Sequence, residues 1–311
     1  MTTFEVPPGE TPVSLLRRYD DAINEGGPQV RVDAGVPVCD IDGWRVNVDV
    51  YQPSGEPPWP AVVFFHGGAW TMGSPASHRR MTAEFAAAGF LTLSVDYPRA
   101  PKWRFPAAYE AASAVVRWAE ANAEQWGASG ALALAGDSAG ANLAAAVLTE
   151  KDRPQVSAAV LMYGIYDFHA ALPLVTPLVG GPSAQDQLYV EPGRFDELRG
   201  DPRLSPLDHV SGFPPCWVGA GTHDPLFAQT ADLADALRDA GVEHEYVPVA
   251  DAPHSYLQLP FLPEYAAWHA SIHSFLRRHL VPAGSATAAA GPPAESPGSR
   301  SGRDPEVGTN P

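Results

Sequence analysis

The sequence predicts an α/β protein built on a mostly parallel, eight-stranded sheet flanked by helices. Continuously apolar stretches of strand length alternate with stretches of helical periodicity through most of the 311 residues. Strands covered on both faces have such apolar sequences, and alternation with helices is typical of parallel strands joined by crossovers. Two earlier segments, in which apolar and polar residues alternate, predict an antiparallel edge.

A short amphipathic helix is the first predicted element. Leu16, Tyr19 and Ile23 recur at helical spacing with charged residues between them, and a Gly-Gly pair follows. That pattern predicts a helix that ends at the glycines. We assign it to an N-terminal cap element of residues 1–35.

The sheet is predicted from eight segments and the remaining helices from the periodic stretches between them. Asp42-Gly43 separates the first two segments and predicts a tight hairpin turn. The strands are expected at 36–41, 44–51, 61–65, 91–95, 131–135, 157–163, 215–221 and 244–249. The helices are expected at about 77–88, 106–120, 141–148, 227–240 and 265–275.

Two segments depart from this rhythm. Residues 167–212 are rich in proline and contain few long periodic runs, and the segment is too long for a plain loop. We expect it to be an inserted lid on a main domain of residues 36–281. Residues 282–311 turn to Pro, Gly, Ser and Ala without aromatics, a composition that cannot bury enough surface to fold, so we expect a disordered tail.

Charge and composition exclude several functional classes. A net charge of −16 argues against a nucleic-acid surface, which needs basic patches. Cys39 and Cys216 lie far apart without metal-ligand spacing, so we expect two thiols rather than a disulfide or a zinc site. No basic, apolar leader and no run of about 18 apolar residues is present. We therefore expect a cytoplasmic protein without a membrane partner, and its oligomeric state stays open, a homodimer included.

The sequence Gly136-Asp137-Ser138-Ala139-Gly140 lies between an apolar strand and a helix-forming run. Gly-x-Ser-x-Gly in this context predicts a tight strand-to-helix turn that exposes the serine hydroxyl. Side chains at the two glycines would collide with the neighbouring strand or helix. Ser138 is therefore the candidate nucleophile, and the backbone N–H of Ala139 is a candidate donor for an oxyanion.

A second motif, His66-Gly67-Gly68-Ala69-Trp70, follows the apolar strand at 61–65 directly. Glycines after a buried strand let the backbone approach a ligand and direct its N–H groups at it. A tetrahedral intermediate needs such donors. We expect His66 to brace this loop through a hydrogen bond. Trp70 fits either the core or the floor of a substrate pocket, and we list it as a candidate substrate-binding residue.

A serine nucleophile needs a histidine base and a carboxylate that orients it. In this fold class they follow the serine in the order acid, then histidine, in loops after strands. His254 follows the last predicted strand and Asp224 the one before it, whereas His223 would lack a matching acid. Asp224 can also cap the helix after it. Asp251 lies in the same turn as His254 and is expected to shape that loop.

At these residues the chain resembles the hormone-sensitive-lipase branch of the α/β-hydrolases, the bacterial acetyl-esterase and lipase-like enzymes. The resemblance spans about residues 60–260. Four motifs carry it: His66-Gly67-Gly68-Ala69-Trp70; Asp96-Tyr97-Pro98-Arg99-Ala100-Pro101 with Phe105-Pro106-Ala107-Ala108; Gly136-Asp137-Ser138-Ala139-Gly140; and Asp224-Pro225-Leu226.

The resemblance implies the α/β-hydrolase fold, a cap built from the N-terminal helix and the insertion, and no cofactor. It also implies an oxyanion hole made by the backbone N–H groups of Gly68, Ala69 and Ala139, with Gly67 shaping the turn. The expected activity is hydrolysis of short- to medium-chain acyl esters through an acyl-enzyme. The expected partner is a small-molecule acyl substrate.

The chain departs from the family pattern at two places. Ala69 stands where the family has a third glycine, which narrows the pocket and disfavours esters of tertiary alcohols. Lys102-Trp103 replaces the usual Glu-His, a change expected to affect surface packing. The altered loop also resembles that of arylformamidases, so an amidase, deacetylase or acyltransferase with the same triad stays an alternative. A binding protein on an inactive hydrolase scaffold is the remaining alternative.

Overall fold

The structure, a computed structural model, describes residues 20–179, 189–191 and 193–281. The predicted tail of residues 282–311 and most of the predicted N-terminal helix lie outside these ranges. Of that helix the structure describes α2 (Asp20–Asn24).

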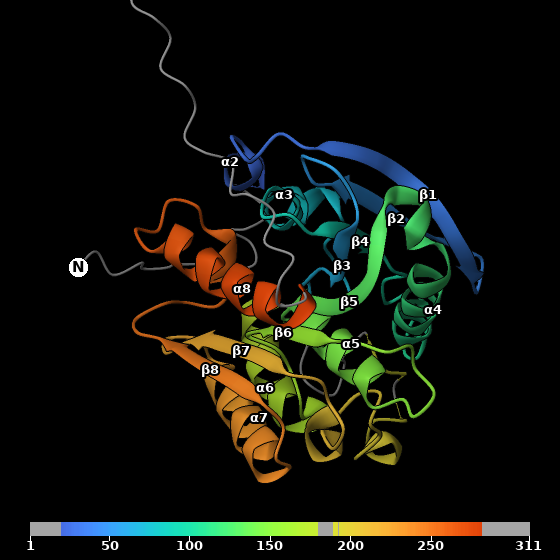
Figure 1. Cartoon of the computed structure of the whole chain (residues 1–311). Helices are drawn as coiled ribbons and strands as arrows, with labels where there is room; N and C mark the ends of the chain where they lie inside the picture. The colour runs from blue at the N-terminus through green and yellow to red at the C-terminus, as the bar shows by residue number, and fades with distance from the viewer. Residues whose placement is uncertain (1–19, 180–188, 192, 282–311) are drawn as a thin grey trace, which may run out of the picture. The chain divides into compact units, whose positions relative to one another are not determined.

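One eight-stranded sheet forms the centre of the described residues, in the order β1-β2-β4-β3-β5-β6-β7-β8 (Figure 1). The first two pairings, β1 with β2 and β2 with β4, are antiparallel and the others are parallel. The predicted mostly parallel sheet with an antiparallel edge is therefore confirmed. The strands are β1 (Arg31–Ile41), β2 (Trp44–Gln52), β3 (Trp59–Phe65), β4 (Leu91–Asp96), β5 (Ala128–Asp137), β6 (Ala158–Met162), β7 (Cys216–Gly221) and β8 (His244–Val249).

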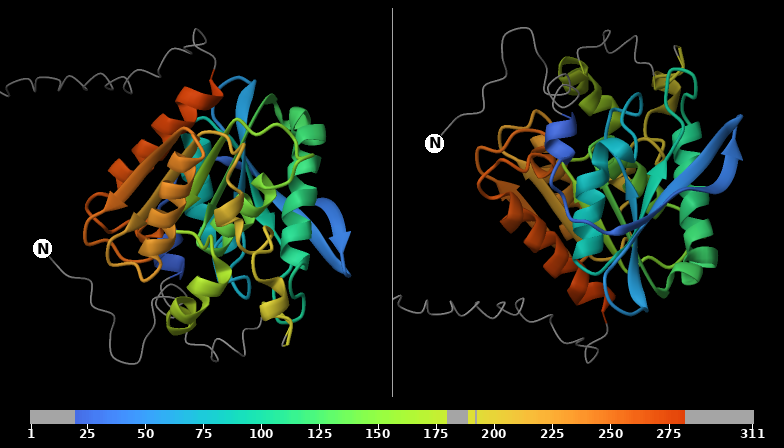
Figure 2. Two further views of the ribbon diagram at one scale, coloured as in Figure 1. Left: turned by 90° about the horizontal axis from the view of Figure 1, so that it is seen from below. Right: turned by 90° about the horizontal axis from the view of Figure 1, so that it is seen from above.

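Helices cover both faces of this sheet (Figure 2). On β3, Val63 and Phe65 face one apolar cluster while Val62 and Phe64 face another. This alternation explains the continuous apolar sequence of the strand, because each face meets its own helical layer. The first cluster includes residues of α4 (Ala107–Asn122), α5 (Ala139–Leu148) and α7 (Phe227–Asp239), and the second includes residues of α3 (Arg79–Ala87) and α8 (Tyr265–Leu280).

The insertion contains a twelve-residue helix, α6 (Phe168–Val179), that the sequence analysis did not predict. Asp167 begins it, because its Oδ1 accepts hydrogen bonds from the backbone N–H groups of His169 and Ala170 at 3.0 and 3.1 Å. Ala171 and Leu172 are fully buried and fix the helix to the core. The sequence analysis named no element within this segment, and its assignment as a lid stays a prediction.

The departure at Lys102-Trp103 does affect packing at the hairpin. The Trp103 ring lies edge-on to that of Trp44, with ring centroids 4.7 Å apart. Its Nε1 donates a hydrogen bond of 3.1 Å to the carbonyl of Asp42 in the hairpin turn. This contact lies among the exposed and half-buried residues of the sheet edge.

The parallel strands bring four loops to one edge of the sheet. The carboxyl ends of β3, β5, β7 and β8 lead into the loops that carry Gly67, Ser138, Asp224 and His254. Parallel neighbours end at the same edge, so residues far apart in sequence meet there.

Candidate active site

The turn between β5 and α5 holds Ser138 in a strained backbone conformation. Its φ of 52° and ψ of −117° lie in a region that costs a non-glycine residue about 1–3 kcal/mol. Its N–H donates a 2.9 Å hydrogen bond to the carbonyl of Met162 on β6. A side chain at Gly140 would strike the carbonyl of Phe65, and one at Gly136 would strike the backbone of Gly140. The two glycines therefore permit the turn.

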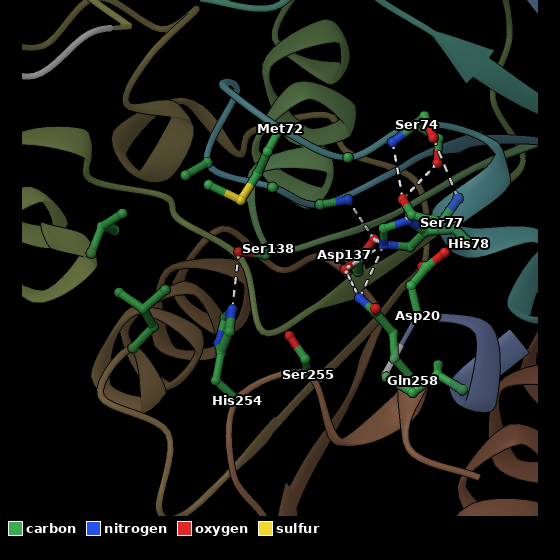
Figure 3. A pocket seen from close by; sticks show the side chains of 17 residues that line it. Asp20, Met72, Ser74, Ser77, His78, Asp137, Ser138, His254, Ser255 and Gln258 are labelled. Carbon is green, nitrogen blue, oxygen red and sulfur yellow. Dashed lines mark hydrogen bonds and ion pairs between the residues drawn. The ribbon is translucent and has the colours of Figure 1, made fainter. Parts of the chain in front are cut away.

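The structure brings the three predicted catalytic side chains together (Figure 3). Nε2 of His254 lies 3.0 Å from Oγ of Ser138, and Nδ1 of His254 lies 2.7 Å from Oδ2 of Asp224. All three residues are buried. This is the arrangement in which a histidine takes the serine proton while a carboxylate orients the imidazole.

The second oxygen of Asp224 fixes the carboxylate itself. Its Oδ1 accepts a 2.8 Å hydrogen bond from the backbone N–H of Leu226, at the entry to α7. Burial alone would lower the pKa of His254, but the charge and hydrogen bond of Asp224 outweigh it and raise that pKa above 6.5. Since Asp224 accepts the Nδ1 proton, the neutral imidazole presents an unprotonated Nε2 to Ser138.

The oxyanion donors that the motifs predict remain available. Gly68 and Ala69 line the pocket, and within the described residues no acceptor takes the N–H of Gly68, Ala69 or Ala139. Gly67 is different, because its N–H donates a 2.7 Å hydrogen bond to Oδ1 of Asp137. Gly67 therefore contributes to the oxyanion hole through the shape of the loop and not as an N–H donor.

Trp70 belongs to the core. The indole is fully buried and stacks on Tyr189, with centroids 4.5 Å apart and planes 4° apart. Phe168 packs edge-on against it, and Trp70 is not among the described residues that line the pocket. Its assignment as a substrate-binding residue was wrong, because an aromatic cluster formed with the insertion encloses it.

His66 braces the donor loop. Its Nδ1 lies 2.8 Å from the carbonyl of Gly67 and must donate to it. The ring stacks on Tyr97, whose hydroxyl donates a 2.7 Å hydrogen bond to the His66 carbonyl. Burial, reinforced by nearby His78, lowers the pKa of His66 to about 3. The imidazole is therefore neutral near pH 7 and is a structural group.

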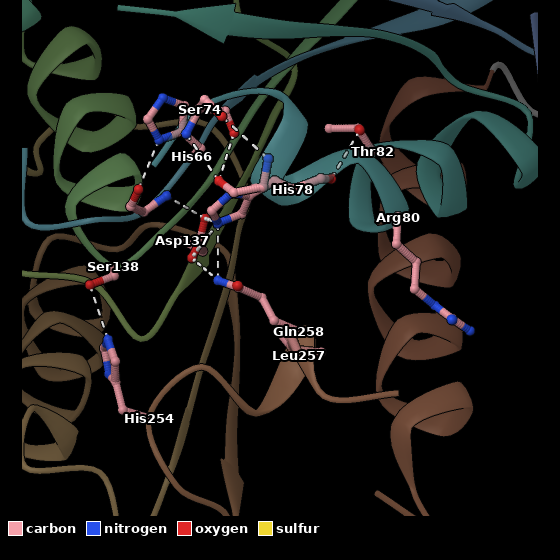
Figure 4. Close-up of polar contacts among 12 residues, drawn as sticks. His66, Ser74, His78, Arg80, Thr82, Asp137, Ser138, His254, Leu257 and Gln258 are labelled. Carbon is pink, nitrogen blue, oxygen red and sulfur yellow. Dashed lines mark hydrogen bonds and ion pairs between the residues drawn. The ribbon is translucent and has the colours of Figure 1, made fainter. Parts of the chain in front are cut away.

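Asp137 connects three of the loops, a role that the sequence analysis missed (Figure 4). The carboxylate is fully buried and accepts hydrogen bonds from Gly67 N–H at 2.7 Å and Gln258 Nε2 at 2.8 Å. His78 Nε2 lies 3.2 Å from its Oδ1. Burial would raise the pKa of Asp137, but His78 and the Gly67 amide lower it overall. Its place beside the nucleophile was the one signal in the sequence.

The triad opens into a cavity of about 360 Å³. Its wall includes Val175 from α6 and Ile23 from α2, so both the insertion and the N-terminal region contribute to it. His223 and Asp251, the residues we had set aside, lie 3.5 Å apart in an exposed pair and are not among its lining residues. Among the described residues no group of three or more His, Cys, Asp or Glu could hold a metal ion.

Comparison with known proteins agrees with this geometry. A family model described as alpha/beta hydrolase fold matches residues 62–258. Carboxylic ester hydrolase LipN of Mycobacterium tuberculosis is 34% identical over 275 residues, covering 82% of this chain and 72% of that protein. Ethyl acetate hydrolase of Pseudomonas putida is 30% identical over 240 residues, covering 72% and 76%.

A solved structure shows the same fold. An esterase of Pyrobaculum calidifontis is 26% identical and superposes with a TM-score of 0.72, covering 88% of this chain and 95% of that one. The family match spans more than half of the chain and contains all three triad residues. The chain belongs to the α/β-hydrolase family, in the hormone-sensitive-lipase-like branch that its motifs resemble.

Proposed function

We propose that this protein is a serine carboxylesterase that cleaves short- to medium-chain acyl esters through an acyl-enzyme on Ser138. The observation that carries the proposal is the hydrogen-bonded series Ser138–His254–Asp224. Three backbone N–H groups for which no described residue is an acceptor lie on the adjacent loop and elbow. The names of the relatives, a carboxylic ester hydrolase and an ethyl acetate hydrolase, favour ester substrates.

Acylation follows from the protonation states that the geometry sets. Ser138 Oγ attacks the ester carbonyl as its proton passes to Nε2 of His254, 3.0 Å away. Asp224 stabilises the imidazolium cation that forms. The oxyanion receives hydrogen bonds from the N–H groups of Gly68, Ala69 and Ala139, each worth about 3–4 kcal/mol of barrier.

Collapse of the intermediate expels the alcohol, which takes the proton from His254. A water molecule, deprotonated by the same imidazole, then attacks the acyl-serine and releases the carboxylic acid. The cavity of about 360 Å³ lies near the lower end of the range for small-molecule sites. That volume supports short and medium acyl chains rather than long ones.

A substrate panel tests this proposal. We expect turnover of p-nitrophenyl acetate and butyrate, a decline at longer acyl chains, and far slower cleavage of matching anilides. Formamide cleavage or acyl transfer to an added alcohol that exceeds hydrolysis would contradict it and favour the alternative activities. Complete inactivity, with no labelling by a fluorophosphonate, would favour a binding protein.

Location is a separate part of the proposal. None of the helices that the structure describes is both long and apolar enough to cross a membrane. The cytoplasmic location and the absence of a membrane partner stay predictions from the sequence. Fractionation of cells that express the full chain tests them, with recovery in the cytoplasmic fraction as the expected result.

A further inference from the structure

Ser255, the residue after His254, has two unusual features. Its backbone is left-handed, with φ 64° and ψ 20°, a conformation uncommon in residues other than glycine. Ser255 is 4% exposed as a whole residue, and no described residue forms a hydrogen bond with its hydroxyl. That hydroxyl is not one of the fully buried unpaired polar atoms, so it stays accessible from the pocket that Ser255 lines. Strained residues persist mainly where a site uses them.

The Ser255 hydroxyl lies in the wall of the catalytic cavity. Ser255 lines the same pocket as Ser138 and His254, and Figure 3 shows its hydroxyl directed into that pocket. Gln258, at the end of the short 3₁₀ turn Tyr256–Gln258, also lines it. The Gln258 amide is held in place because its Nε2 donates to Asp137 at 2.8 Å.

Polar side chains gather on this side of the catalytic pair. In Figure 3, Ser74, Ser77 and His78 lie beyond Asp137, on the same side of Ser138 and His254 as Gln258. The Ser77 hydroxyl is 2.9 Å from Nδ1 of His78, so part of this wall is satisfied internally. Ser255 carries the side-chain hydroxyl nearest in sequence to His254, and no described residue pairs with it.

The position of Ser255 indicates which arm of the ester it meets. His254 returns its proton to the leaving alkoxide, so the alcohol oxygen must come within hydrogen-bond reach of Nε2. The alcohol arm therefore starts beside His254, next to Ser255. A hydroxyl on that arm, a few bonds from the ester oxygen, would pair with the unpaired hydroxyl of Ser255.

We propose that Ser255, with the Gln258 amide behind it, forms a subsite for a hydroxyl group on the leaving alcohol. The preferred substrates are then esters of diols and polyols, such as glycol or glycerol esters, rather than esters of simple alkyl alcohols. This inference rests on the proposed esterase function, because the subsite acts only when Ser138 cleaves the ester.

Two esters of equal size test the subsite. 2-Hydroxyethyl butyrate and n-propyl butyrate differ only by OH in place of CH₃ at the end of the alcohol. We expect wild-type kcat/KM to favour the hydroxyl ester, and this preference to fall about three- to tenfold in Ser255→Ala, the size of one neutral hydrogen bond. The chemical reactivities of the two esters cancel when their ratio is compared between protein variants.

Ser255→Gly and Asp251→Gly complete the experiment. Ser255→Gly removes the hydroxyl and also relieves the backbone strain, so the same loss of preference in both Ser255 variants assigns the effect to the hydroxyl. Asp251 is the matched control, because it has φ 58° in the same loop but is exposed and outside the pocket lining. We expect Asp251→Gly to keep the wild-type ratio.

The failures of the two proposals are distinguishable. An unchanged ester ratio in Ser255→Ala and Ser255→Gly would overturn the subsite while leaving the esterase function intact. A wild-type preference for the propyl ester would also overturn it. Failure of the wild-type protein to hydrolyse either ester would instead contradict the esterase function on which the subsite depends.

Discussion

His254 acts as a base only when its imidazole is neutral, so its pKa determines the low-pH limit of activity. Asp224 raises that pKa above 6.5 despite the opposing effect of burial. We expect kcat/KM to fall as pH decreases, with a midpoint above 6.5. The protonated His254–Asp224 pair also stabilises the folded protein, because the pKa of His254 is higher in the folded state. This contribution to the free energy of unfolding is fully present below pH 6.5 and is lost as pH rises through the folded-state pKa.

Asp224→Asn tests this electrostatic assignment. Loss of the carboxylate should move the midpoint of the acid limb to lower pH and reduce kcat by about 10⁴-fold. The pH dependence of kcat/KM with p-nitrophenyl butyrate measures both effects. A wild-type midpoint at or below 6.5, or a variant with the wild-type profile, would show that Asp224 does not control the base.

Ala69 is a second residue whose substitution has a defined outcome. Its φ of 50° costs a residue with a Cβ roughly 1–2 kcal/mol, and glycine there would add about 0.4–1 kcal/mol of unfolded-state entropy. The relieved strain is the larger of the two effects, so Ala69→Gly should leave the free energy of unfolding unchanged or raise it by up to about 1 kcal/mol. Because Ala69 lines the pocket, the lost methyl should raise the rate on tert-butyl acetate relative to ethyl acetate. An unchanged rate ratio would contradict this.

Single residues also show how far the sequence could predict the site. Ser138, Asp224 and His254 could be placed because each follows a strand whose apolar sequence is clear. The role of Trp70 could not, because it depends on the ring of Tyr189, which lies far along the chain in the insertion. The residues that contact Asp137 are also distant from it in the sequence, so no local pattern could predict these contacts.

At the scale of structural elements, the Asp137 carboxylate joins two of the loops that form the active site. Asp137 accepts hydrogen bonds from the donor loop and from the turn after His254. In Asp137→Asn an amide NH₂ would replace one of the acceptor oxygens and face a donor. The unsatisfied pair should lower the free energy of unfolding by about 1–3 kcal/mol. We expect kcat to fall roughly 5- to 150-fold, because misplaced loops weaken transition-state contacts.

Asp251→Asn is the control for this variant. Its carboxylate is exposed, and surface substitutions usually change stability by no more than about 0.5 kcal/mol. Steady-state kinetics together with urea unfolding measure both proteins. Wild-type kcat and stability in Asp137→Asn would show that the buried carboxylate does not organise these loops.

Strands and helices with strong periodicity were predicted within five residues of their observed bounds, and the largest differences are at the start of β1 and the end of α8. α6 was missed because Pro173 interrupts its pattern and proline disfavours helix interiors. Asp167, whose carboxylate accepts the first N–H groups of α6, was not recognised as a helix start in the sequence analysis. The aromatic and aliphatic side chains that hold the insertion in place pack against residues far away in the sequence, so a local pattern cannot reveal these contacts.

For the whole molecule, the order of strands in the sheet required the structure. Periodicity identifies the strands and the faces that they bury, but the spatial order β1-β2-β4-β3-β5 depends on which crossovers pack over which edge. The boundaries proposed for the cap, lid and tail stay predictions.

Stability in acid is a property of the whole fold that Asp137 influences. A folded-state pKa below the ordinary value of 3.8 gives stabilisation that is present above that value and is lost as pH falls through the folded pKa. The free energy of unfolding, measured in urea between pH 3 and pH 7, should therefore fall at the acid end. Asp137→Asn should show a smaller fall, and equal slopes in the two proteins would contradict the assignment.

The central claim is that one hydroxyl, at Ser138, forms the covalent intermediate. Incubation of the full-length protein with a fluorophosphonate, followed by peptide mass spectrometry, tests it directly. We predict a single adduct on Ser138, none in Ser138→Ala, and a loss of about 10⁶-fold in kcat in that variant. An adduct on another residue, or ester turnover that survives Ser138→Ala, would contradict the account.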